Sequence, residues 1–496
     1  MMKSFNLIHE KWIPCFLLNG KYEDLSLNDI FRNATKIKEI ESGSPLVNIS
    51  LYRFLLAILH RNFGPSDIDE WIELWEKEEF DFDKTQKYLL KFENRFDLFD
   101  KEHPFYQSNN INGSKKEDIY SLFLEYSYGN NNAFFDHSHE KNEKYFDFKD
   151  CAIALITSQN YGRKVEMSGI INYGNLYDGT SIIMDGNNLK DILVLNMMFY
   201  DISEDDIPIW EKDNENYEDK IYYDGYLDYL TYQNRFIKLI ENEGNSISKI
   251  FIKQNKLIVE NKDLDPFFSY KKIKTNDQKD EIVRYNIKKD VSSWRDYNSI
   301  FGIRELTIKP KIIKQISEII AKYRKISSNK KIKDDIFYKT SIFGISHESG
   351  IGKSKINIWR QEKLPISFSI IENEILRDCI NNIIDYSEKI ENILHGSIRY
   401  FSSMVVKKDN VKSFTNSIYK VEFYWHSLEI KFYEILIKLS EENKIDIINE
   451  WQSFVMKIAK ESLELSIKDM DYSAKYLKAS CGTRQYFYGK INKLIR

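Results

Sequence analysis

The carboxy-terminal part of the sequence restricts the possible folds most strongly, because it consists almost wholly of long segments with helical spacing. After Pro365, apolar residues recur every three to four positions, as on one face of an α-helix. Four successive helices are predicted, at residues 370–404, 416–440, 443–469 and 471–494. Consecutive helices of this length with short connections pack as antiparallel neighbours. The sequence therefore predicts a four-helix bundle at residues 368–496.

The preceding part, residues 1–367, has a mixed pattern. Helical periods occur at residues 47–63, 68–95, 189–200 and 305–326. Short apolar runs between turn residues predict two strands in the opening residues 5–21 and further strands at 247–252, 257–260, 267–272 and 336–345. We therefore expect an α+β protein, with a large, mixed, mainly helical amino-terminal domain that contains short strands, followed by the four-helix bundle.

Charge is unevenly distributed along the chain, although the 496 residues carry a net charge of only −4. Residues 270–364 contain 23 basic and 11 acidic side chains, a net charge of +12, and residues 371–496 carry +1. Because residues 365–370 are uncharged, residues 1–269 carry −17. One basic stretch in an otherwise acidic chain indicates a site for a polyanion.

Cysteine usage and hydropathy point to a cytoplasmic protein. The four cysteines form no CxxC pair, which argues against a disulfide framework or a cysteine-based zinc site. The opening residues lack the apolar core of a signal peptide, and the sequence contains no run of about 18 apolar residues. We predict no membrane association and no cofactor.

Two local motifs offer alternative enzymatic interpretations. The string from Gly350 to Ser354 resembles the end of a phosphate-binding P-loop, but His347 stands where the first glycine of that motif is needed. The run from Asp136 to Glu140 contains His137 and His139 and suggests a metal site, although no distant pair of ligands completes it. A P-loop-like nucleotide hydrolase and a metal-dependent nuclease therefore remain alternative hypotheses. Hydrolytic motifs are otherwise missing from the sequence, so we predict a non-catalytic protein without a metal site.

A series of short segments carries a family resemblance. The segments are residues 5–14 (FNLIHEKWIP), 102–107 (EHPFYQ), 133–137 (AFFDH), 184–197 (MDGNNLKDILVLNM), 265–266 (DP), 293–296 (SWRD) and 355–365 (KINIWRQEKLP). In their order and spacing, and with the helical bundle after them, they resemble the CasA-type large subunit of the type I-E CRISPR Cascade complex. The resemblance covers nearly the whole chain.

The resemblance implies a DNA-recognising role without catalysis. Members of this family recognise the protospacer-adjacent motif (PAM) through the minor groove of target DNA and promote duplex opening and R-loop formation in antiviral defence. Ser168 and Gly169 correspond to the family's glycine loop, and Lys271 and Lys272 match the position of its minor-groove lysine. Lysine suits the acceptor atoms and negative potential of the minor groove.

Two further sites follow from the same resemblance. A hairpin that drives a glutamine wedge into the duplex corresponds to Gly350, Gly352, Lys353, Ser354 and Lys355, and Lys353 takes the place of the glutamine. The resemblance assigns the anchoring on guide RNA and on neighbouring subunits to a loop with three residues, Phe134, Phe135 and Asp136. The implied partners are the backbone, small and guide-end-capping subunits of the complex, guide RNA, target double-stranded DNA and a separate nuclease.

Overall fold

The computed structural model divides the chain into two compact units. Unit 1 comprises Met1–Ser293, Leu306–Ile332 and Tyr338–Leu364, and unit 2 includes Trp294–Glu305 and Pro365–Arg496. The residues that the structure describes are 3–109, 111–126, 145–162, 165–167, 170–201, 203–212, 222–242, 244–255, 265–275, 277–326, 338–348, 355–439, 443–468 and 473–495. The two units are described separately below.

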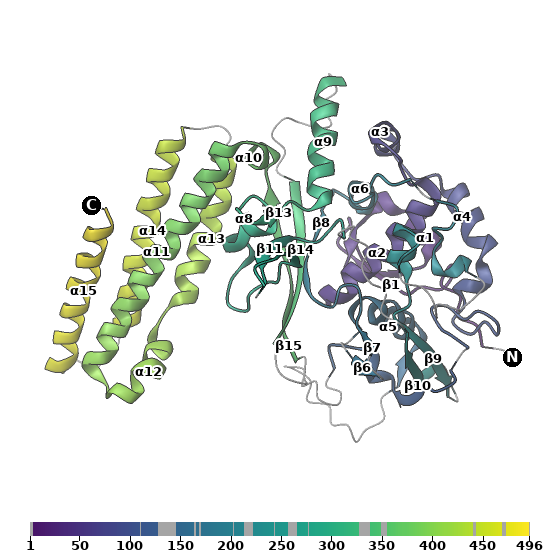
Figure 1. The fold of residues 1–496 in the computed structure, drawn as a ribbon, viewed down its shortest axis with the longest axis horizontal. Coiled ribbons are helices and arrows are strands. Elements are labelled where there is room, and N and C mark those ends of the chain that lie inside the picture. The colour runs from purple at the N-terminus through teal and green to yellow at the C-terminus, as the bar shows by residue number, and fades with distance from the viewer. Residues whose placement is uncertain are drawn as a thin grey trace. The chain divides into compact units, whose positions relative to one another are not determined.

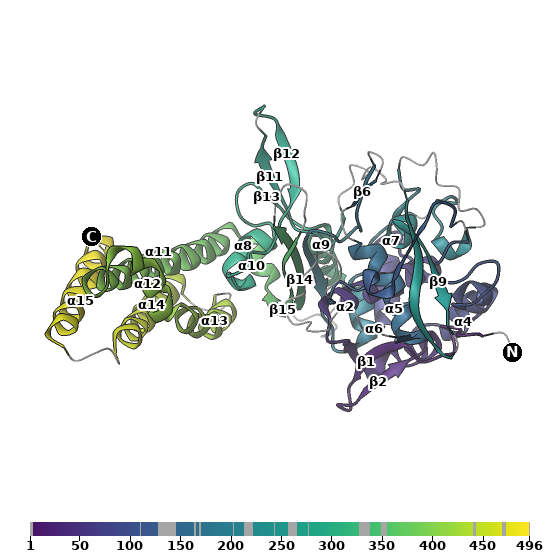
Figure 2. The ribbon, with the colours of Figure 1, turned by 90° about the horizontal axis from the view of Figure 1, so that it is seen from below.

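Unit 1 contains short sheets and helices in a mixed order (Figures 1 and 2). Its α-helices are α1 (Leu27–Arg32), α2 (Pro45–Phe63), α3 (Ile68–Glu76), α4 (Phe82–Lys91), α5 (Phe148–Tyr161), α6 (Leu189–Leu195), α7 (Tyr226–Thr231) and α9 (Lys311–Ile326). Its strands are β1 (Ile13–Leu17), β2 (Tyr22–Leu25), β3 (Ile37–Ile40), β4 (Lys115–Asp118), β5 (Phe146–Asp147), β6 (Val165–Met167), β7 (Ile170–Asn172), β8 (Gly179–Met184), β9 (Arg235–Glu241), β10 (Ser246–Gln254), β11 (Tyr270–Lys274), β12 (Asp280–Arg284), β13 (Thr307–Ile308), β14 (Tyr338–Glu348) and β15 (Lys355–Ile366).

The strands form several small sheets. Their orders are β2-β1-β3, β4-β10-β5 with β9 also on β10, β12-β11-β13, β15-β14-β8 and the pair β6-β7. Antiparallel pairing joins β1 to β2 and β3, β10 to β4, β5 and β9, β11 to β12 and β13, β14 to β8, and β6 to β7. Short sheets of this kind need helices or further strands to cover their apolar faces. In unit 1 the central helix α2 contacts β3 and β14 in two of these sheets.

Helix α2 forms the centre of the core of unit 1. Every residue from Asn48 to His60 is buried, so this helix lies inside the unit rather than on its surface. It packs against α4, α5, α6 and α7 and against β3 and β14. Phe54 contacts the rings of Trp12, Phe105 and Trp210 edge-on, with centroids 5.6–5.9 Å apart. The elements that pack on α2 therefore share one apolar centre.

Unit 2 is built from long helices. They are α10 (Phe368–Glu372), α11 (Glu374–Val405), α12 (Val411–Ile418), α13 (Val421–Lys438), α14 (Lys444–Ile467) and α15 (Ala474–Ile495), together with the short α8 (Tyr297–Ile300). Helix α11 packs against α14 and α15, and α13 packs against α14, as Figure 1 shows. The expected mixed α+β class with a carboxy-terminal helical region is confirmed.

A short segment from the middle of the chain completes the core of unit 2. Trp294 is 1% exposed, and its ring centroid lies 4.9 Å from that of Phe432, 5.8 Å from Trp425 and 6.4 Å from Trp451. The Arg295 guanidinium lies 3.5 Å from the centroid of the Trp425 ring. The sequence-based prediction assigned all residues up to 367 to the amino-terminal domain, so this segment was not expected among the helices of unit 2.

Local details differ from several sequence-based expectations. The helix expected at 305–326 begins at Lys311, because residues 307–308 pair as β13 and Pro310 lacks the N–H that a helix interior needs. The helix expected at 189–200 ends at Leu195, where the Asn196 side chain donates to the Ile192 and Met184 carbonyls. The opening strands are β1 and β2, and residues 5–8 contribute only an isolated bridge between Asn6 and Asp97.

Three further expectations concern the helical pattern at 68–95, the strand at 257–260 and the membrane. The helical pattern at 68–95 is divided into α3 and α4, since the Asp81 side chain caps the second helix. The strand expected at 257–260 lies outside the described residues. Within the described part of the chain, no helix combines the length and the apolar character needed to cross a membrane.

The packing of Trp294 generates a prediction about stability. Replacement of Trp294 by alanine removes a buried ring from contact with three aromatic neighbours, so we expect unit 2 to lose about 3–5 kcal/mol of its free energy of unfolding. Urea denaturation of the full chain, followed by far-ultraviolet circular dichroism, measures this loss. Leu477→Ala, at a 58% exposed position on α15, is the control and should change stability by less than about 0.5 kcal/mol. A similar small change for Trp294→Ala would contradict the assignment.

Candidate nucleic-acid interface

The two lysines predicted to enter the minor groove lie on a β-hairpin. Strands β11 and β12 pair from Tyr270 opposite Arg284 to Lys274 opposite Asp280, and Figure 2 shows this hairpin projecting from the rest of unit 1. At the described part of the turn, the amides of Gln278 and Lys279 donate to the carbonyl and to the side-chain oxygen of Thr275, respectively. On its other side, β11 pairs with β13. The hairpin is therefore a two-stranded ribbon that is anchored at its base by a third strand.

Strand geometry places Lys271 and Lys272 on opposite faces of this ribbon, because successive side chains of a strand alternate. Lys272 lies opposite Ile282 and is exposed. Lys271 lies opposite Val283 and is half-buried, with its Nζ 5.9 Å from the centroid of the Tyr285 ring. The sequence placed both lysines at one position of the family pattern, whereas the structure separates them.

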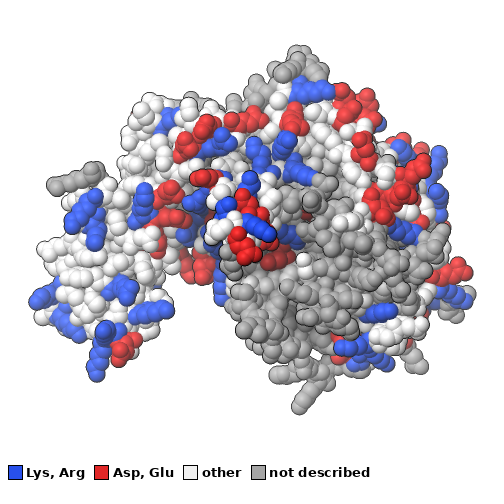
Figure 3. All heavy atoms as spheres, in the orientation of Figure 1, with Lys and Arg blue, Asp and Glu red and all other residues white. Residues whose placement is uncertain are grey.

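The hairpin carries acidic as well as basic side chains. Residues 270–284 contain five basic side chains and three acidic ones. The Nζ of Lys274 lies 2.7 Å from the Asp280 carboxylate, and both side chains are more than half exposed. This ion pair also lowers the pKa of Asp280 through its hydrogen bond. Figure 3 accordingly shows acidic and basic side chains close together on the visible face of unit 1.

The start of β11 is anchored in the core by an ion pair that sequence reasoning missed. Arg53 on α2 donates through Nη1 to the Asp265 carboxylate at 2.9 Å, and both side chains are 1% exposed. The Tyr229 hydroxyl donates to the same carboxylate at 2.6 Å, and the Phe267 amide donates to its second oxygen at 2.9 Å. A charged residue in the middle of the apolar run 47–63 was the available signal, since a buried arginine needs a partner.

Electrostatics at this pair are governed by burial and by the opposite charge. Burial by itself would raise the pKa of Asp265, but the Arg53 charge and the hydrogen bonds from Tyr229 and Phe267 outweigh it and hold that pKa below its ordinary value. The Asp265 amide also donates to the Tyr270 hydroxyl at 2.8 Å. Residue 265 is thereby tied both to the core and to the first residue of β11.

The other predicted sites lie mainly outside the described residues. These are Ser168 and Gly169, Gly350, Gly352, Lys353 and Ser354, and Phe134, Phe135 and Asp136. Lys355 begins β15. The structure describes the strands beside two of these loops: β6 and β7 pair with Met167 opposite Ile170, and β14 and β15 are neighbours in one sheet. Residues 136–140, to which the metal hypothesis refers, also lie outside the described residues. The residues that the structure describes contain no cluster of three metal-binding side chains.

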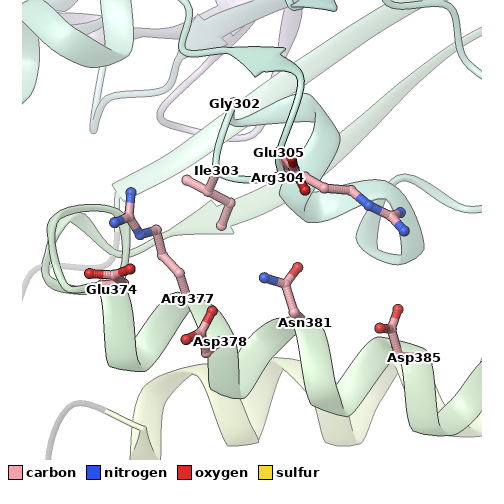
Figure 4. A pocket seen from close by; sticks show the side chains of 9 residues that line it. All are labelled: Gly302, Ile303, Arg304, Glu305, Glu374, Arg377, Asp378, Asn381 and Asp385. Carbon is pink, nitrogen blue, oxygen red and sulfur yellow. The ribbon is translucent and has the colours of Figure 1, made fainter.

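An open pocket in unit 2 does not suit a polyanion. Its lining residues are Gly302, Ile303, Arg304, Glu305, Glu374, Arg377, Asp378, Asn381 and Asp385. Figure 4 shows Asp378, Asn381 and Asp385 directed from α11 toward the loop that contains Gly302. Four carboxylates against two guanidinium groups would repel phosphates. The basic β-hairpin of unit 1 is therefore the better candidate for a nucleic-acid interface.

Comparison with known proteins supports the family resemblance. The sequence model of the CRISPR-associated protein Cse1 family matches residues 6–462. The chain belongs to this family. A CRISPR-associated protein CasA/Cse1 from Thermus thermophilus is 24% identical over 523 residues, which cover 100% of this chain and 99% of that protein.

Solved structures of family members share the fold. The crystal structure of CasA from Thermus thermophilus matches with a TM-score of 0.80 at 21% identity, over 99% of this chain and 100% of that chain. A chain of a structure described as a CRISPR RNA-guided surveillance complex matches with a TM-score of 0.71 at 16% identity, over 98% of this chain and 99% of that chain. At these identities the structural likeness establishes the fold.

The Arg53–Asp265 pair generates a prediction about pH dependence. Because the pKa of Asp265 is lower in the folded state than its ordinary value of 3.8, the pair contributes its full stabilisation above that value. The contribution is lost as pH falls through the folded-state pKa. Asp265→Asn leaves the Arg53 charge without its counter-ion and should cost about 3–5 kcal/mol at pH 7.

Urea denaturation between pH 3 and pH 7 measures this dependence. The difference in stability between the original chain and Asp265→Asn should shrink toward the acid end. The control is Asp83→Asn, an exposed position on α4. A difference that stays constant over this range would contradict the role of Asp265 as a buried carboxylate.

Proposed function

We propose that this chain is the large, non-catalytic subunit of a type I-E CRISPR RNA-guided surveillance complex (Cascade). In this role it recognises the PAM in double-stranded DNA through the minor groove, and it promotes duplex opening and R-loop formation in antiviral defence. Family membership and the fold shared with a chain of such a complex support the proposal. Its partners are the other Cascade subunits, guide RNA, target DNA and a separate nuclease.

The observation that carries the proposal is the exposed lysine on the projecting β11–β12 hairpin. The two adjacent lysines face opposite sides, so only one of them enters a given groove. We assign this position to Lys272, because its side chain is exposed while the Lys271 ammonium group lies over the Tyr285 ring. A lysine in the minor groove meets the N3 and O2 acceptors of the bases and their enhanced negative potential.

The division of charge fits the same role. The net positive charge is concentrated in residues 270–364, which include the β11–β12 hairpin and most of the β14–β15 strands, whereas residues 1–269 carry a net negative charge. A basic hairpin attracts DNA, and the acidic surface disfavours broad contact with it. Sequence beyond the PAM is then read by pairing between guide and target. In this proposal the acidic part of the chain docks on basic partner subunits.

Three loops complete the proposed site. Ser168 and Gly169 correspond to the loop that approaches the groove through its backbone, and the loop with Phe134, Phe135 and Asp136 anchors the chain on guide RNA and on neighbouring subunits. Lys353 occupies the position of the strand-separating wedge, between Gly352 and Ser354, with Lys355 beside it. These assignments rest on the match to the family pattern.

The lysines give a prediction that separates base contact from phosphate contact. In the assembled complex, Lys272→Ala should weaken binding to a target duplex with the preferred PAM by about 5- to 50-fold, the equivalent of one lost base contact. Lys271, on the other face, is expected to contact phosphate. Lys271→Ala should therefore weaken binding less than Lys272→Ala does, and by the same factor for every duplex. The loss of one phosphate contact should also reduce the slope of log affinity against log salt by about 1. Fluorescence anisotropy at several salt concentrations measures both quantities.

The matched control is Lys87→Ala, an exposed lysine on α4 in the acidic part of the chain. It should leave the affinity and the salt slope unchanged. Unchanged affinity for both hairpin variants would contradict the groove assignment. Hydrolysis of ATP or DNA by the isolated chain would contradict the non-catalytic role.

A further inference from the structure

The strands that lead to the proposed DNA-contacting loops meet at one segment of unit 1. This segment, residues 173–178, follows β7 and precedes β8, and we call it the junction segment. It is contacted by residues at the ends of β12 and β14, which belong to two different sheets, and β14 pairs directly with β8. The junction segment therefore links the base of the β11–β12 hairpin to the end of β14, directly after β7 in the chain.

Contacts from β12 hold the junction segment through its backbone. Arg284, the last residue of β12, donates through Nη1 to the carbonyl oxygens of Asn175 and Asp178, at 2.7 and 3.2 Å. Its guanidinium carbon lies 4.1 Å from the centroid of the Phe268 ring. Two residues later, the side-chain amide of Asn286 donates to the Asp178 carboxylate at 2.9 Å. The base of the β11–β12 hairpin is thus bound to the junction segment by charge-assisted hydrogen bonds.

Contacts from β14 reach the same residues. The ring of His347, one residue before the end of β14, stacks on Tyr177 with centroids 4.0 Å apart and an angle of 12° between the planes. Its Nδ1 lies 3.7 Å from the Asp178 carboxylate. Strand β8 starts directly after the junction segment, and its first residue, Gly179, lies opposite Ile345 of β14. The β14 strand is therefore held in register with this segment.

The junction segment rests on a close-packed support. The amides of Gly174 and Leu176 donate to the carbonyl oxygens of Gly162 and Asn160, at 2.9 and 2.7 Å, where α5 ends. A Cβ atom at Gly174 would lie 2.2 Å from the Asn160 carbonyl oxygen, so only glycine permits this approach. Leu176 is 1% exposed. Close packing of this kind transmits a displacement instead of absorbing it.

We infer that the junction segment sets the placement of the β11–β12 hairpin relative to the β14 strand, with Arg284 and Asp178 as positioning residues for PAM discrimination. This inference rests on the proposed function. Arg284 acts through the backbone of the junction segment, and Asp178 acts through Asn286 and His347. Recognition elements must be held to within about 0.5 Å to read a groove selectively. Loss of these contacts therefore reduces selectivity more than it reduces general attraction to DNA.

The test compares selectivity with general affinity in the assembled complex. The readout is the ratio of the affinities for two duplexes that carry the same target and differ only in the PAM. For Arg284→Ala we expect this ratio to fall about tenfold, as for one mismatched position, while affinity for a non-target duplex changes less than about twofold. Arg284→Lys should restore part of the ratio, because its ammonium group still donates to the two carbonyl oxygens.

Asp178→Asn provides an independent variant. The substituted side chain keeps an oxygen that can accept from Asn286, but it removes the negative charge beside His347. It should also reduce the ratio, and it decides the question if Arg284→Ala does not assemble. Arg32→Ala, an exposed arginine on α1, is the matched control and should leave the ratio unchanged. Equal losses for all duplexes, including the non-target one, would overturn the inference.

The outcomes separate this inference from the proposed function. If Lys272→Ala changes PAM-dependent binding while the Arg284 and Asp178 variants leave the ratio unchanged, the junction inference is wrong and the groove assignment stands. If the Lys271 and Lys272 variants also bind with unchanged affinity, the proposed groove recognition itself is wrong.

Discussion

The buried ion pair between Arg53 and Asp265 is the constraint on which the arrangement of unit 1 depends. Two opposite charges that are each 1% exposed are tolerated only when they are paired and hydrogen-bonded. The Tyr229 hydroxyl and the Phe267 amide complete the shell of donors around the carboxylate. Because residue 265 lies five residues before Tyr270, the position of the β11–β12 hairpin follows from that of the central helix α2. The hairpin thereby projects from a base that is tied to the core.

A second long-range contact defines unit 2. The chain leaves β12, contributes Trp294 and its neighbours to the core of the helical unit, and returns as β13 beside β11. Trp294 contacts aromatic rings on α13 and α14, so the helices by themselves do not complete this core. Residues 294–305, part of the interval between two strands of one sheet, therefore belong to another unit. Unit 2 thus draws its core from separate stretches of the chain.

Sequence patterns predicted the elements well where the signal was local. The apolar run at 47–63 appears as α2 at Pro45–Phe63, and the four long helices after Pro365 appear at close to the expected residues. Predictions failed where a neighbour in space decided the local structure. Residues 307–308 continue a helical pattern in sequence, but they pair with β11 as a strand. The sequence predicts one site for the two adjacent lysines, whereas the register of the hairpin places them on opposite faces.

By itself, the sequence determined the family, the mixed fold class and the helical carboxy-terminal region, because ordered motifs and periodic apolar spacing are properties of neighbouring residues. The tertiary structure decided which residues act together. Arg53 and Asp265 are 212 positions apart, and Arg284 lies 109 positions from Asn175. The faces of Lys271 and Lys272 likewise depend on strand pairing. Such pairings arise from the burial of charge and apolar surface between distant segments, which no local pattern encodes.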